Sequence, residues 1–418
     1  MSDAHGVLVI GAGPAGLAAA YRAAEHGLRV TVVDDNPAAG GQIWRGGEET
    51  AESSEAQAWF EKIRSVDIEL IAGARVFQQP RAGTLLAETQ SGVCELNYEK
   101  LILATGARER FLPFPGWTLP NVMGAGGLQA LVKTGLPIEE KRVVVAGSGP
   151  LLLAVAGYLR TRGAEVLLIA EQASWSRLVK FGLGLIGQPN RIRQGWNLRA
   201  PRYLSGCWVV KAQGEGKVES ATLVRGEKQW SVSCDYLACG FHLEPNVELA
   251  ELLGCEVGRE GVTVSEFQET SVPNVSGAGE VTGIGGLELS LVEGEIAGLA
   301  AAGKREEARK LFKLRDQQRR FARLLNETFA LRDELKQLVQ PETIVCRCED
   351  VTFERLHVHD SWRAAKLQTR CGMGPCQGRV CGSAVEFLFG WHAESVRPPV
   401  LPVRLESLLS AQEGTNTK

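Results

Sequence analysis

Two stretches of the chain repeat one pattern of apolar and polar positions. The first stretch starts with an apolar run at residues 7–11, continues through an alanine-rich segment at 14–27, and closes with a second apolar run at 28–33. Short apolar runs bounded by glycine are typical of buried parallel strands, and the segment between them is typical of a helix. The pattern therefore predicts a strand, a helix and a strand within about 30 residues.

The same pattern returns later in the chain. An apolar run at 142–146 precedes an expected helix at 150–163 and a further apolar run at 165–170. Such an internal duplication indicates two dinucleotide-type folds in tandem. The predicted fold class is α/β, with two tandem Rossmann-like dinucleotide-binding domains.

The rest of the sequence pattern predicts shorter helices and strands and a domain boundary. Residues 304–338 are strongly charged, and their apolar positions recur at mostly helical spacing, which indicates one or two amphipathic helices. A cysteine-dense segment and a proline-rich tail follow, so we place the main boundary near Gln340. Short strands are expected at 100–104, 208–212, 221–224 and 236–238.

Composition and charge exclude several classes of protein. The 418 residues are 44% hydrophobic and 23% charged, which excludes a disordered, collagenous or coiled-coil chain. No apolar run reaches the roughly 18 residues that span a bilayer, and the N-terminus lacks a basic signal region. We expect a cytoplasmic protein and leave peripheral docking on the inner face of a membrane open.

Charge also argues against a nucleic-acid partner. With 46 basic and 49 acidic residues, the chain has no global positive field. A local basic stretch is more typical of a solvated face or a subunit contact than of a nucleic-acid site. It contains Arg191, Arg193, Arg199 and Arg202.

A glycine-rich loop stands between the first predicted strand and helix. Gly11 permits a tight turn, Gly13 lets a pyrophosphate approach the backbone, and Gly16 lets the helix lie close to the strand. Asp34 ends the second strand, where a carboxylate accepts hydrogen bonds from a ribose; Asp35 is the alternative. Together these residues predict a dinucleotide site.

The second glycine loop is less regular. Gly147 and Gly149 match the pattern, but Leu152 stands where a third small residue belongs, and it either pushes the helix away or fills space. Glu171, at the end of the following strand, suits a ribose diol and not a 2'-phosphate. The loop therefore predicts a working NADH site, an adenine-nucleotide site or a retained scaffold.

Cysteine usage separates two populations. Five of the ten cysteines are scattered, as small core or surface residues, and five crowd into residues 346–381. In a reducing compartment such crowding indicates metal binding more readily than disulfides. Thiolates in two close groups can bind zinc or a [2Fe-2S] cluster. The crowded five are Cys346, Cys348, Cys371, Cys376 and Cys381.

Three further segments resemble flavoproteins with two dinucleotide domains: 37–42, 103–106 and 276–280. In that family the last segment ends in aspartate, whereas Glu280 here is one methylene longer. A helix beginning near Leu287 would point its amides at the flavin. By this resemblance the FAD site comprises Gly11, Gly13, Pro14, Ala15, Gly16, Asp34, Asp35, Gly41, Gln42, Val76, Thr105, Gly106, Gly279, Glu280 and Leu287.

The cysteine segment resembles the bacterioferritin-associated-ferredoxin-like [2Fe-2S] domain, through Cys-Arg-Cys-Glu-Asp and Gly-Met-Gly-Pro-Cys-Gln-Gly-Arg-Val-Cys. That match implies Cys346, Cys348, Cys376 and Cys381 as ligands, with Cys371 as a spare thiol or a substitute ligand. Three arginines could offset the thiolate charge. They are Arg347, Arg370 and Arg379.

Over nearly its whole length, the chain resembles the FAD-containing alpha subunits of heteromeric amino-acid dehydrogenases, a family that includes the corresponding subunits of opine oxidase, hydrogen cyanide synthase and hydroxyproline dehydrogenase. Residues 34–45 and 238–250 carry the resemblance beside the cysteine segment. It implies an FAD domain at 1–115 and 242–340 with trailing helices, an NAD(P)-binding-like domain at 116–241, and a [2Fe-2S] domain with a tail at 341–418.

The resemblance also implies a function. A separate flavin-containing beta subunit would oxidise the C–N bond of an amino acid or derivative, such as hydroxyproline, proline, an opine, sarcosine or glycine. This chain would then pass electrons to a quinone or other acceptor. Whether the enzyme also contains a small gamma subunit stays open. The alternatives are an NADH-dependent flavin and iron-sulfur reductase and a non-enzymatic iron-sulfur binding module.

Overall fold

A computed structural model describes residues 5–50, 53–184, 202–393 and 395–416 of the chain. Three of the four arginines in the basic stretch, Arg191, Arg193 and Arg199, lie outside the described residues. The chain forms two compact units, each built from separated segments. Unit 1 comprises Met1–Arg108, Pro245–Arg323 and Ser395–Lys418, and unit 2 comprises Glu109–Glu244 and Leu324–Glu394.

Unit 1 is built on a seven-stranded sheet with the order β3-β2-β1-β6-β5-β4, in which β19 also pairs with β6. Strands β3, β2, β1, β6 and β19 are parallel neighbours, whereas β4, β5 and β6 pair in antiparallel fashion. The strands are β1 (His5–Ile10), β2 (Val30–Asp34), β3 (Ile68–Ala72), β4 (Arg75–Arg81), β5 (Thr84–Thr89), β6 (Gly92–Leu103) and β19 (Val275–Gly277).

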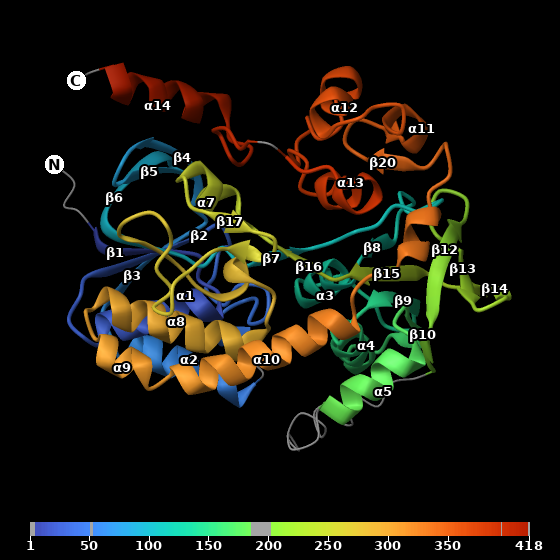
Figure 1. Cartoon of the computed structure of the whole chain (residues 1–418), viewed down its shortest axis with the longest axis horizontal. Helices are drawn as coiled ribbons and strands as arrows, with labels where there is room; N and C mark the ends of the chain where they lie inside the picture. The colour runs from blue at the N-terminus through green and yellow to red at the C-terminus, as the bar shows by residue number, and fades with distance from the viewer. Residues whose placement is uncertain (1–4, 51–52, 185–201, 394, 417–418) are drawn as a thin grey trace. The chain divides into compact units, whose positions relative to one another are not determined.

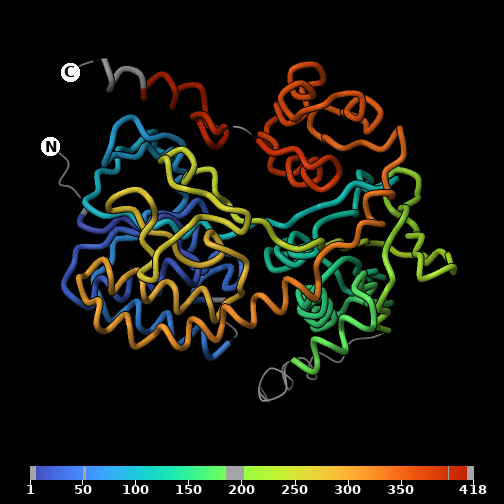
Figure 2. The backbone as a smooth tube through the Cα atoms, in the orientation of Figure 1, coloured from blue at the N-terminus to red at the C-terminus, as the bar shows by residue number. Residues whose placement is uncertain are grey.

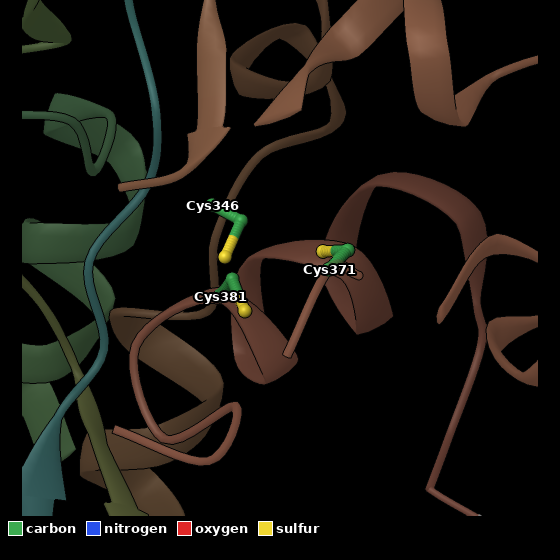
Figure 3. Close-up of side chains that lie close together, drawn as sticks. All are labelled: Cys346, Cys371 and Cys381. Carbon is green, nitrogen blue, oxygen red and sulfur yellow. The ribbon is translucent and has the colours of Figure 1, made fainter. Parts of the chain in front are cut away.

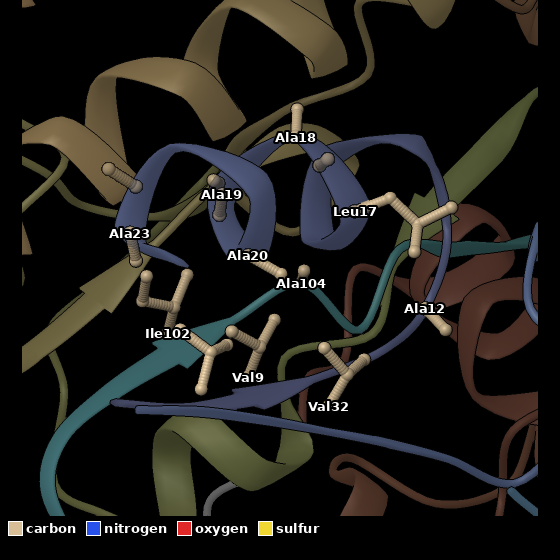
Figure 4. Packing of buried hydrophobic residues seen from close by; sticks show 14 of the residues in the cluster. Val9, Ala12, Leu17, Ala18, Ala19, Ala20, Ala23, Val32, Ile102 and Ala104 are labelled. Atoms are coloured by element: carbon tan, nitrogen blue, oxygen red, sulfur yellow. The ribbon is translucent and has the colours of Figure 1, made fainter. Parts of the chain in front are cut away.

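Helices α1 (Pro14–Ala24) and α8 (Leu287–Ala301) pack against each other in this unit. Figure 4 shows the small side chains of α1 lying over Val9 and Ile102 of the sheet and over Ala104, which follows β6. The other elements of unit 1 are short or peripheral. They are η1 (Glu48–Thr50), α2 (Ser54–Arg64), α7 (Glu248–Leu252), β17 (Val257–Gly258), β18 (Gly261–Val262), η2 (Gly279–Thr282), α9 (Arg305–Arg309) and α14 (Leu405–Asn416).

The close approach of α1 and α8 depends on two glycines. A Cβ added to Gly294 would lie 2.2 Å from the carbonyl oxygen of Ala15, and one added to Gly298 would lie 2.2 Å from that of Ala19. Both distances are far shorter than a van der Waals contact. Glycines four residues apart on α8 therefore let the two backbones touch, which fixes the spacing of α1 and α8.

Unit 2 has a five-stranded parallel sheet with the order β11-β10-β9-β15-β8, and a three-stranded antiparallel sheet, β12-β13-β14 (Figure 1). The parallel strands are β8 (Val122–Gly124), β9 (Arg142–Ser148), β10 (Glu165–Glu171), β11 (Tyr203–Ser205) and β15 (Tyr236–Phe241). The others are β12 (Cys207–Gln213), β13 (Ser220–Arg225) and β14 (Lys228–Ser233), with helices α3 (Ala125–Lys133), α4 (Leu151–Thr161) and α5 (Trp175–Gly184).

The cysteine segment belongs to unit 2 and folds back on itself, as the orange-red part of the tube at residues 341–393 shows in Figure 2. Its own core includes Val345, Leu356 and Trp362. Its elements are β20 (Ile344–Cys346), β21 (Val351–Thr352), α11 (Phe353–Leu356), α12 (Trp362–Thr369) and α13 (Cys381–Phe389), after η3 (Asp333–Gln337). The predicted three-domain division at 115, 241 and 340 stays a prediction.

The α/β fold and the two repeated strand, helix and strand patterns are confirmed: β1, α1 and β2 form one, and β9, α4 and β10 the other. The expected amphipathic helices are α9 and α10 (Phe312–Thr328). Strands β7 (Ala107–Glu109) and β16 (Leu243–Pro245) lie where the chain passes between its units. No helix among the described residues is both long and apolar enough to cross a membrane.

Candidate functional site

The first glycine loop, between β1 and α1, is shaped by positions that only glycine can occupy. Gly11 has a φ of +107°, and a Cβ on it would lie 2.2 Å from the carbonyl oxygen of Ala104. A Cβ on Gly16 would lie 1.8 Å from the carbonyl oxygen of Gly11. The tight turn and the close contact of helix and strand therefore both require glycine.

Gly13 and Gly41 form the open side of this loop. Gly13 caps α1 without a side-chain hydrogen bond, and the first turn of the helix contains no acidic residue. The backbone amide of Gly40 donates to the carbonyl of Ala12 at 2.7 Å, and a Cβ on Gly41 would lie 2.9 Å from the Cα of Gly13. Pro14 and Ala15 begin the helix, and exposed Gln42 follows the turn.

The uncapped amides at the start of α1 fit an anionic group such as a pyrophosphate. Because side chains are missing at both Gly13 and Gly41, a ligand could approach the backbone closely there. The chemistry of this cradle therefore fits a dinucleotide.

The carboxylate of Asp34, at the end of β2, is hydrogen-bonded to the first glycine loop. Asp34 is buried; one carboxylate oxygen accepts from the amide of Ala12 at 2.5 Å, and the other accepts from the amide and side chain of Asn36 at 2.8 and 2.7 Å. Asp35 is exposed. Of the two alternatives, Asp34 is the one that the fold fixes at the edge of the glycine loop.

Thr105 and Gly106, where β6 ends, are tied to Asn246. The Thr105 hydroxyl donates to the carbonyl of Asn246 at 2.7 Å, the Asn246 side-chain amide donates to the carbonyl of Thr105 at 2.9 Å, and Gly106 adopts a φ of +66°. Asn246 is absent from the predicted site, although it lies in the quoted segment 238–250. Val76, in β4, is buried in a hydrophobic cluster that includes Ile10, Val33 and Leu103.

The predicted segment 276–280 leads into η2 beside the start of α1. Gly279 has a φ of +76°, and a Cβ on it would lie 2.6 Å from the Cβ of Ala15. Burial raises the pKa of Glu280, and a hydrogen bond from the amide of Gly286 opposes that rise. Leu287 is the first residue of α8. The segment therefore meets the glycine loop from the α8 side.

A buried acid that the sequence reasoning missed holds this turn in place. Glu293 of α8 is 2% exposed, and one oxygen accepts from the amide of Gly279 at 3.2 Å and from the Thr282 hydroxyl at 2.9 Å. Its other oxygen accepts from the Arg319 guanidinium at 2.8 Å. Glu293 shares a helix face with Leu289 and Ala297, and a carboxylate on an apolar face was the signal that could have pointed to it.

The second glycine loop uses its acid in a similar way. Glu171 is fully buried, and its two oxygens accept from the amides of Gly149 and Ala173, each at 2.8 Å. Burial raises the pKa of Glu171 to about 7. Leu152 is also fully buried within the core of unit 2, so this leucine fills space.

An irregular segment of the protein's own backbone, at Phe329, lies against this second loop. The Ser148 hydroxyl donates to the carbonyl of Phe329 at 2.7 Å, and the Gln172 amide donates to Ser148 at 2.8 Å and to the carbonyl of Phe329 at 3.3 Å. A Cβ on Gly149 would lie 3.9 Å from the Phe329 ring, and that ring is buried. Phe329 therefore occupies space beside the glycines where a nucleotide would approach.

Three of the crowded cysteines meet in the interior of the C-terminal segment. The sulfur atoms of Cys346, Cys371 and Cys381 lie within 4.8 Å of one another, and all three residues are buried (Figure 3). Cys346 ends β20, Cys381 begins α13, and Cys371 follows the end of α12. Hydrogen bonds from Cys371 and then from Cys381 hold the pKa of Cys346 well below its usual range.

The other two crowded cysteines, Cys348 and Cys376, are less buried than these three. Cys348 is exposed, Cys376 is half-buried, and the two thiols share a hydrogen bond. A Cβ on Gly374 would lie 2.3 Å from the Cβ of Cys348, so glycine is required where these two loops approach.

All four cysteines of the predicted ligand set line one pocket of about 500 Å³, and Cys371 is not among its lining residues. Four free thiols that line one pocket fit an iron-sulfur cluster or zinc. Whether Cys371 is a spare thiol or a substitute ligand stays open. The pocket is lined by Glu109, Phe111, Trp117, Val122, Met123, Gly124, Cys346, Arg347, Cys348, Cys376, Val380 and Cys381.

Glu109 is a further residue that the sequence did not reveal. Its carboxylate accepts from the amides of Gly126 and Gly127 at 2.7 and 2.9 Å, at the start of α3, and burial raises its pKa. Of the three predicted arginines, Arg347 lines the pocket, whereas Arg370 donates to Glu349 at 2.7 Å and Arg379 to Gln377 at 3.1 Å.

The family model for pyridine nucleotide-disulphide oxidoreductases matches residues 5–303. Among characterised proteins, the chain is 31% identical to the HcnB protein of hydrogen cyanide synthase from Pseudomonas aeruginosa, covering 90% of each chain. It is 29% identical to an opine oxidase subunit of Agrobacterium tumefaciens, covering 98% of this chain and 92% of that protein.

Solved structures show the same fold. L-proline dehydrogenase from P. horikoshii matches with a TM-score of 0.67 at 18% identity, over 97% of this chain and 79% of that chain. Thioredoxin reductase from T. acidophilum matches with a TM-score of 0.55 at 21% identity, over 71% of this chain and 97% of that chain. The second match therefore leaves a larger part of this chain uncovered than the first.

Proposed function

We propose that this chain, which belongs to the pyridine nucleotide-disulphide oxidoreductase family, is the FAD-containing and [2Fe-2S]-containing electron-transfer subunit of a heteromeric enzyme. The enzyme would oxidise the C–N bond of an amino acid or derivative of the hydroxyproline, proline, opine, sarcosine or glycine class. Oxidation would take place in a flavin-containing partner subunit. Two relatives that match most of the chain are themselves named as subunits, which supports such an assembly.

The observation that carries this proposal is the presence of two sites with different chemistry in one chain. The first is the glycine cradle at the start of α1, whose amides suit a pyrophosphate and whose neighbour Asp34 suits a ribose. The second is the pocket lined by four thiols. A flavin accepts electrons in pairs or singly and a [2Fe-2S] cluster takes them one at a time, so the combination suits electron relay.

Each set of residues has a defined task in this proposal. The start of α1 would hold the FAD pyrophosphate, Glu280 would face the ribityl chain, and the amides at the start of α8 would favour negative charge on the flavin. Glu293 fixes the turn that presents Glu280. At the other site, the cysteine thiolates would bind the iron, and Arg347 would offset part of their charge.

An NADH-dependent reductase is the main competing function, and the second glycine loop argues against it. Phe329 and its carbonyl group already use Ser148 and Gln172 as donors, and Glu171 is buried and bound to two amides. A dinucleotide would have to displace this backbone segment and expose Glu171. This loop is therefore better suited to a scaffold than to a hydride donor.

The proposal is tested by rapid mixing of the purified chain and of its complex with the partner subunit. Under anaerobic conditions, NADH should leave the flavin absorbance unchanged. An amino-acid substrate is first found by screening prolines, opines, glycine and sarcosine. This substrate should bleach the flavin absorbance of the complex and leave that of the isolated chain unchanged. Bleaching by NADH would favour the reductase, and a purified chain without flavin would refute the proposal.

A further inference from the structure

The pocket lined by the four thiols is built from two segments of unit 2. The cysteines of the proposed ligand set come from the C-terminal segment, and most of the remaining lining comes from residues 109–124. Among the described residues that line the pocket, Glu109 is the only acid and Arg347 the only base. An iron-sulfur cluster bound to these thiolates would therefore share its pocket with one carboxylate.

The carboxylate of Glu109 is held in a fixed place at the start of α3. Its two oxygens accept from the amides of Gly126 and Gly127 at 2.7 and 2.9 Å. A Cβ on Gly124 would lie 2.3 Å from a carboxylate oxygen of Glu109, and one on Gly126 would lie 3.3 Å from its carboxyl carbon. The carboxylate therefore fills space that side chains at these glycines would need, and backbone groups fix its position.

This anchoring does not neutralise the charge of Glu109. Burial raises the pKa of its carboxyl, and hydrogen bonds from the amides of Gly126, Gly127 and Ala125 oppose that rise. Amides at the start of a helix stabilise an ionised carboxylate, but they add no positive charge of their own beyond the helix dipole. The ionised side chain therefore keeps its negative charge beside the pocket.

The rest of the lining allows a charge at Glu109 to act across the pocket. Trp117 and Val122 are 5% and 4% exposed, and such apolar walls lower the local dielectric, which strengthens the interaction between charges. A compact space of about 500 Å³ is comparable in width to the Debye length, about 10 Å at 0.1 M salt, so screening between its walls is weak. A charge on one wall therefore acts on a cluster held by the other.

We propose that Glu109 lowers the reduction potential of the iron-sulfur cluster. Reduction adds one electron to a site that already carries the negative charge of four thiolates, and a fixed carboxylate nearby makes that addition less favourable. The electron balance is that of the proposed relay: one electron arrives from the flavin and one leaves to the acceptor. A lower potential makes the reduced cluster a stronger donor to that acceptor. This inference deepens the proposed function and rests on its cluster.

Redox titration of the full-length protein at pH 8, followed by the electron paramagnetic resonance signal of the reduced cluster, tests this inference. Glu109→Gln keeps the shape of the side chain and one acceptor oxygen for the amides of α3, but it removes the charge. The ratio of reduced to oxidised cluster at a given potential should rise about tenfold, which is a shift of about 59 mV to higher potential. Glu227→Gln is the matched control, because it removes an exposed carboxylate from the turn between β13 and β14, and its potential should equal that of the wild type.

Two results would overturn the inference. The first is a Glu109→Gln protein that binds iron normally and titrates at the potential of the wild type, because Glu109 would then serve only to cap α3. The second concerns Arg347→Gln, which removes the base of the lining and should shift the potential in the opposite direction to Glu109→Gln. A shift of both variants in the same direction would show that altered packing, and not charge, moves the potential.

A further variant keeps the test decisive if Glu109→Gln does not fold. Met123→Glu places a second carboxylate in the lining and should lower the potential, so an unchanged potential would also overturn the inference. Iron and labile sulfide analysis separates the two proposals. A wild-type chain without a cluster would refute the proposed function itself, whereas a cluster with an unchanged potential in the variants would refute only the role of Glu109.

Discussion

Three buried or partly buried glutamates share a role at the residue scale: each uses its carboxylate to hold backbone amides of a turn. Glu171 binds the amides of Gly149 and Ala173, Glu293 that of Gly279, and Glu109 those of Gly126 and Gly127. Such bonds compensate part of the cost of burying a carboxylate. For Glu171 the compensation is incomplete, because its pKa is still raised to about 7.

This raised pKa predicts a pH dependence of stability. The folded chain keeps a proton on Glu171 between its ordinary pKa of 4.5 and about 7, whereas the unfolded chain releases it. The unfolding free energy should therefore fall as pH rises through this interval. From about pH 5 to about pH 8, the wild type should lose about 2 to 3 kcal/mol more than Glu171→Gln.

Denaturant unfolding of both proteins at several pH values measures this difference. All other carboxylates are common to the two proteins, so their contributions cancel in the comparison. Parallel curves for wild type and Glu171→Gln would show that Glu171 is ionised without penalty in the folded chain.

The four pocket thiols predict a second residue-scale effect. Replacing Cys376 by alanine removes one of four thiolates, so iron and labile sulfide per chain should fall at least about fivefold, together with the visible absorbance of the cluster. Cys94→Ala is the matched control, since Cys94 is a half-buried free thiol in β6 of unit 1. Iron analysis and absorption spectra provide the measurement.

Equal iron in Cys376→Ala and Cys94→Ala would contradict the proposed ligand set. The same analysis of Cys371→Ala decides the role of that residue. Full iron content would make Cys371 a spare thiol, and loss of iron would make it a ligand.

At the scale of elements, the contact between α1 and α8 positions the first candidate site. It brings Ala15, at the start of α1, against Gly279 of the turn and Gly294 of α8. Because three backbones meet at Ala15, the glycine loop and the segment with Glu280 keep a fixed spacing. The first candidate site therefore requires small residues at Ala15, Gly279 and Gly294.

Gly294→Ala should consequently destabilise the chain, because the new methyl group would overlap the carbonyl of Ala15. We expect a loss of about 2 kcal/mol or more in unfolding free energy, despite the better helix propensity of alanine. Flavin binding should weaken as well. Gly182→Ala in α5 is the control: a Cβ there meets no atom within 4 Å, so this change should be neutral or slightly stabilising.

Denaturant unfolding and flavin titration of the two variants measure these effects. If Gly294→Ala is as stable as Gly182→Ala, then α1 and α8 can separate without cost, and their contact does not fix the site.

Sequence patterns predicted the elements best where chain neighbours decide the structure. The repeated strands and helices follow from local periodicity, and β1, α1, β9 and α4 lie close to their predicted positions. Phe329 could not be placed in this way, because its contact with Ser148 joins residues 181 positions apart. The pairing of Glu293 with Arg319 could not be predicted for the same reason, since it depends on how α8 and α10 pack.

For the whole molecule, the glycine loops and the cluster of cysteines were easier to predict than the contacts that support them. Glycine loops and cysteine spacings are signatures of chemistry, so the cradle at Gly13 and the thiol pocket were both expected. The environment of Glu109 and the filled second loop depend on distant segments of the chain. The central proposal, electron relay through this chain, rests on both kinds of residue.

Freeze-quench electron paramagnetic resonance of the complex with its partner subunit tests this proposal most directly. After anaerobic mixing with the amino-acid substrate, the signal of a reduced [2Fe-2S] cluster should appear at least as fast as turnover and disappear when an electron acceptor is added. A cluster that stays oxidised through repeated turnovers would contradict electron relay through this chain.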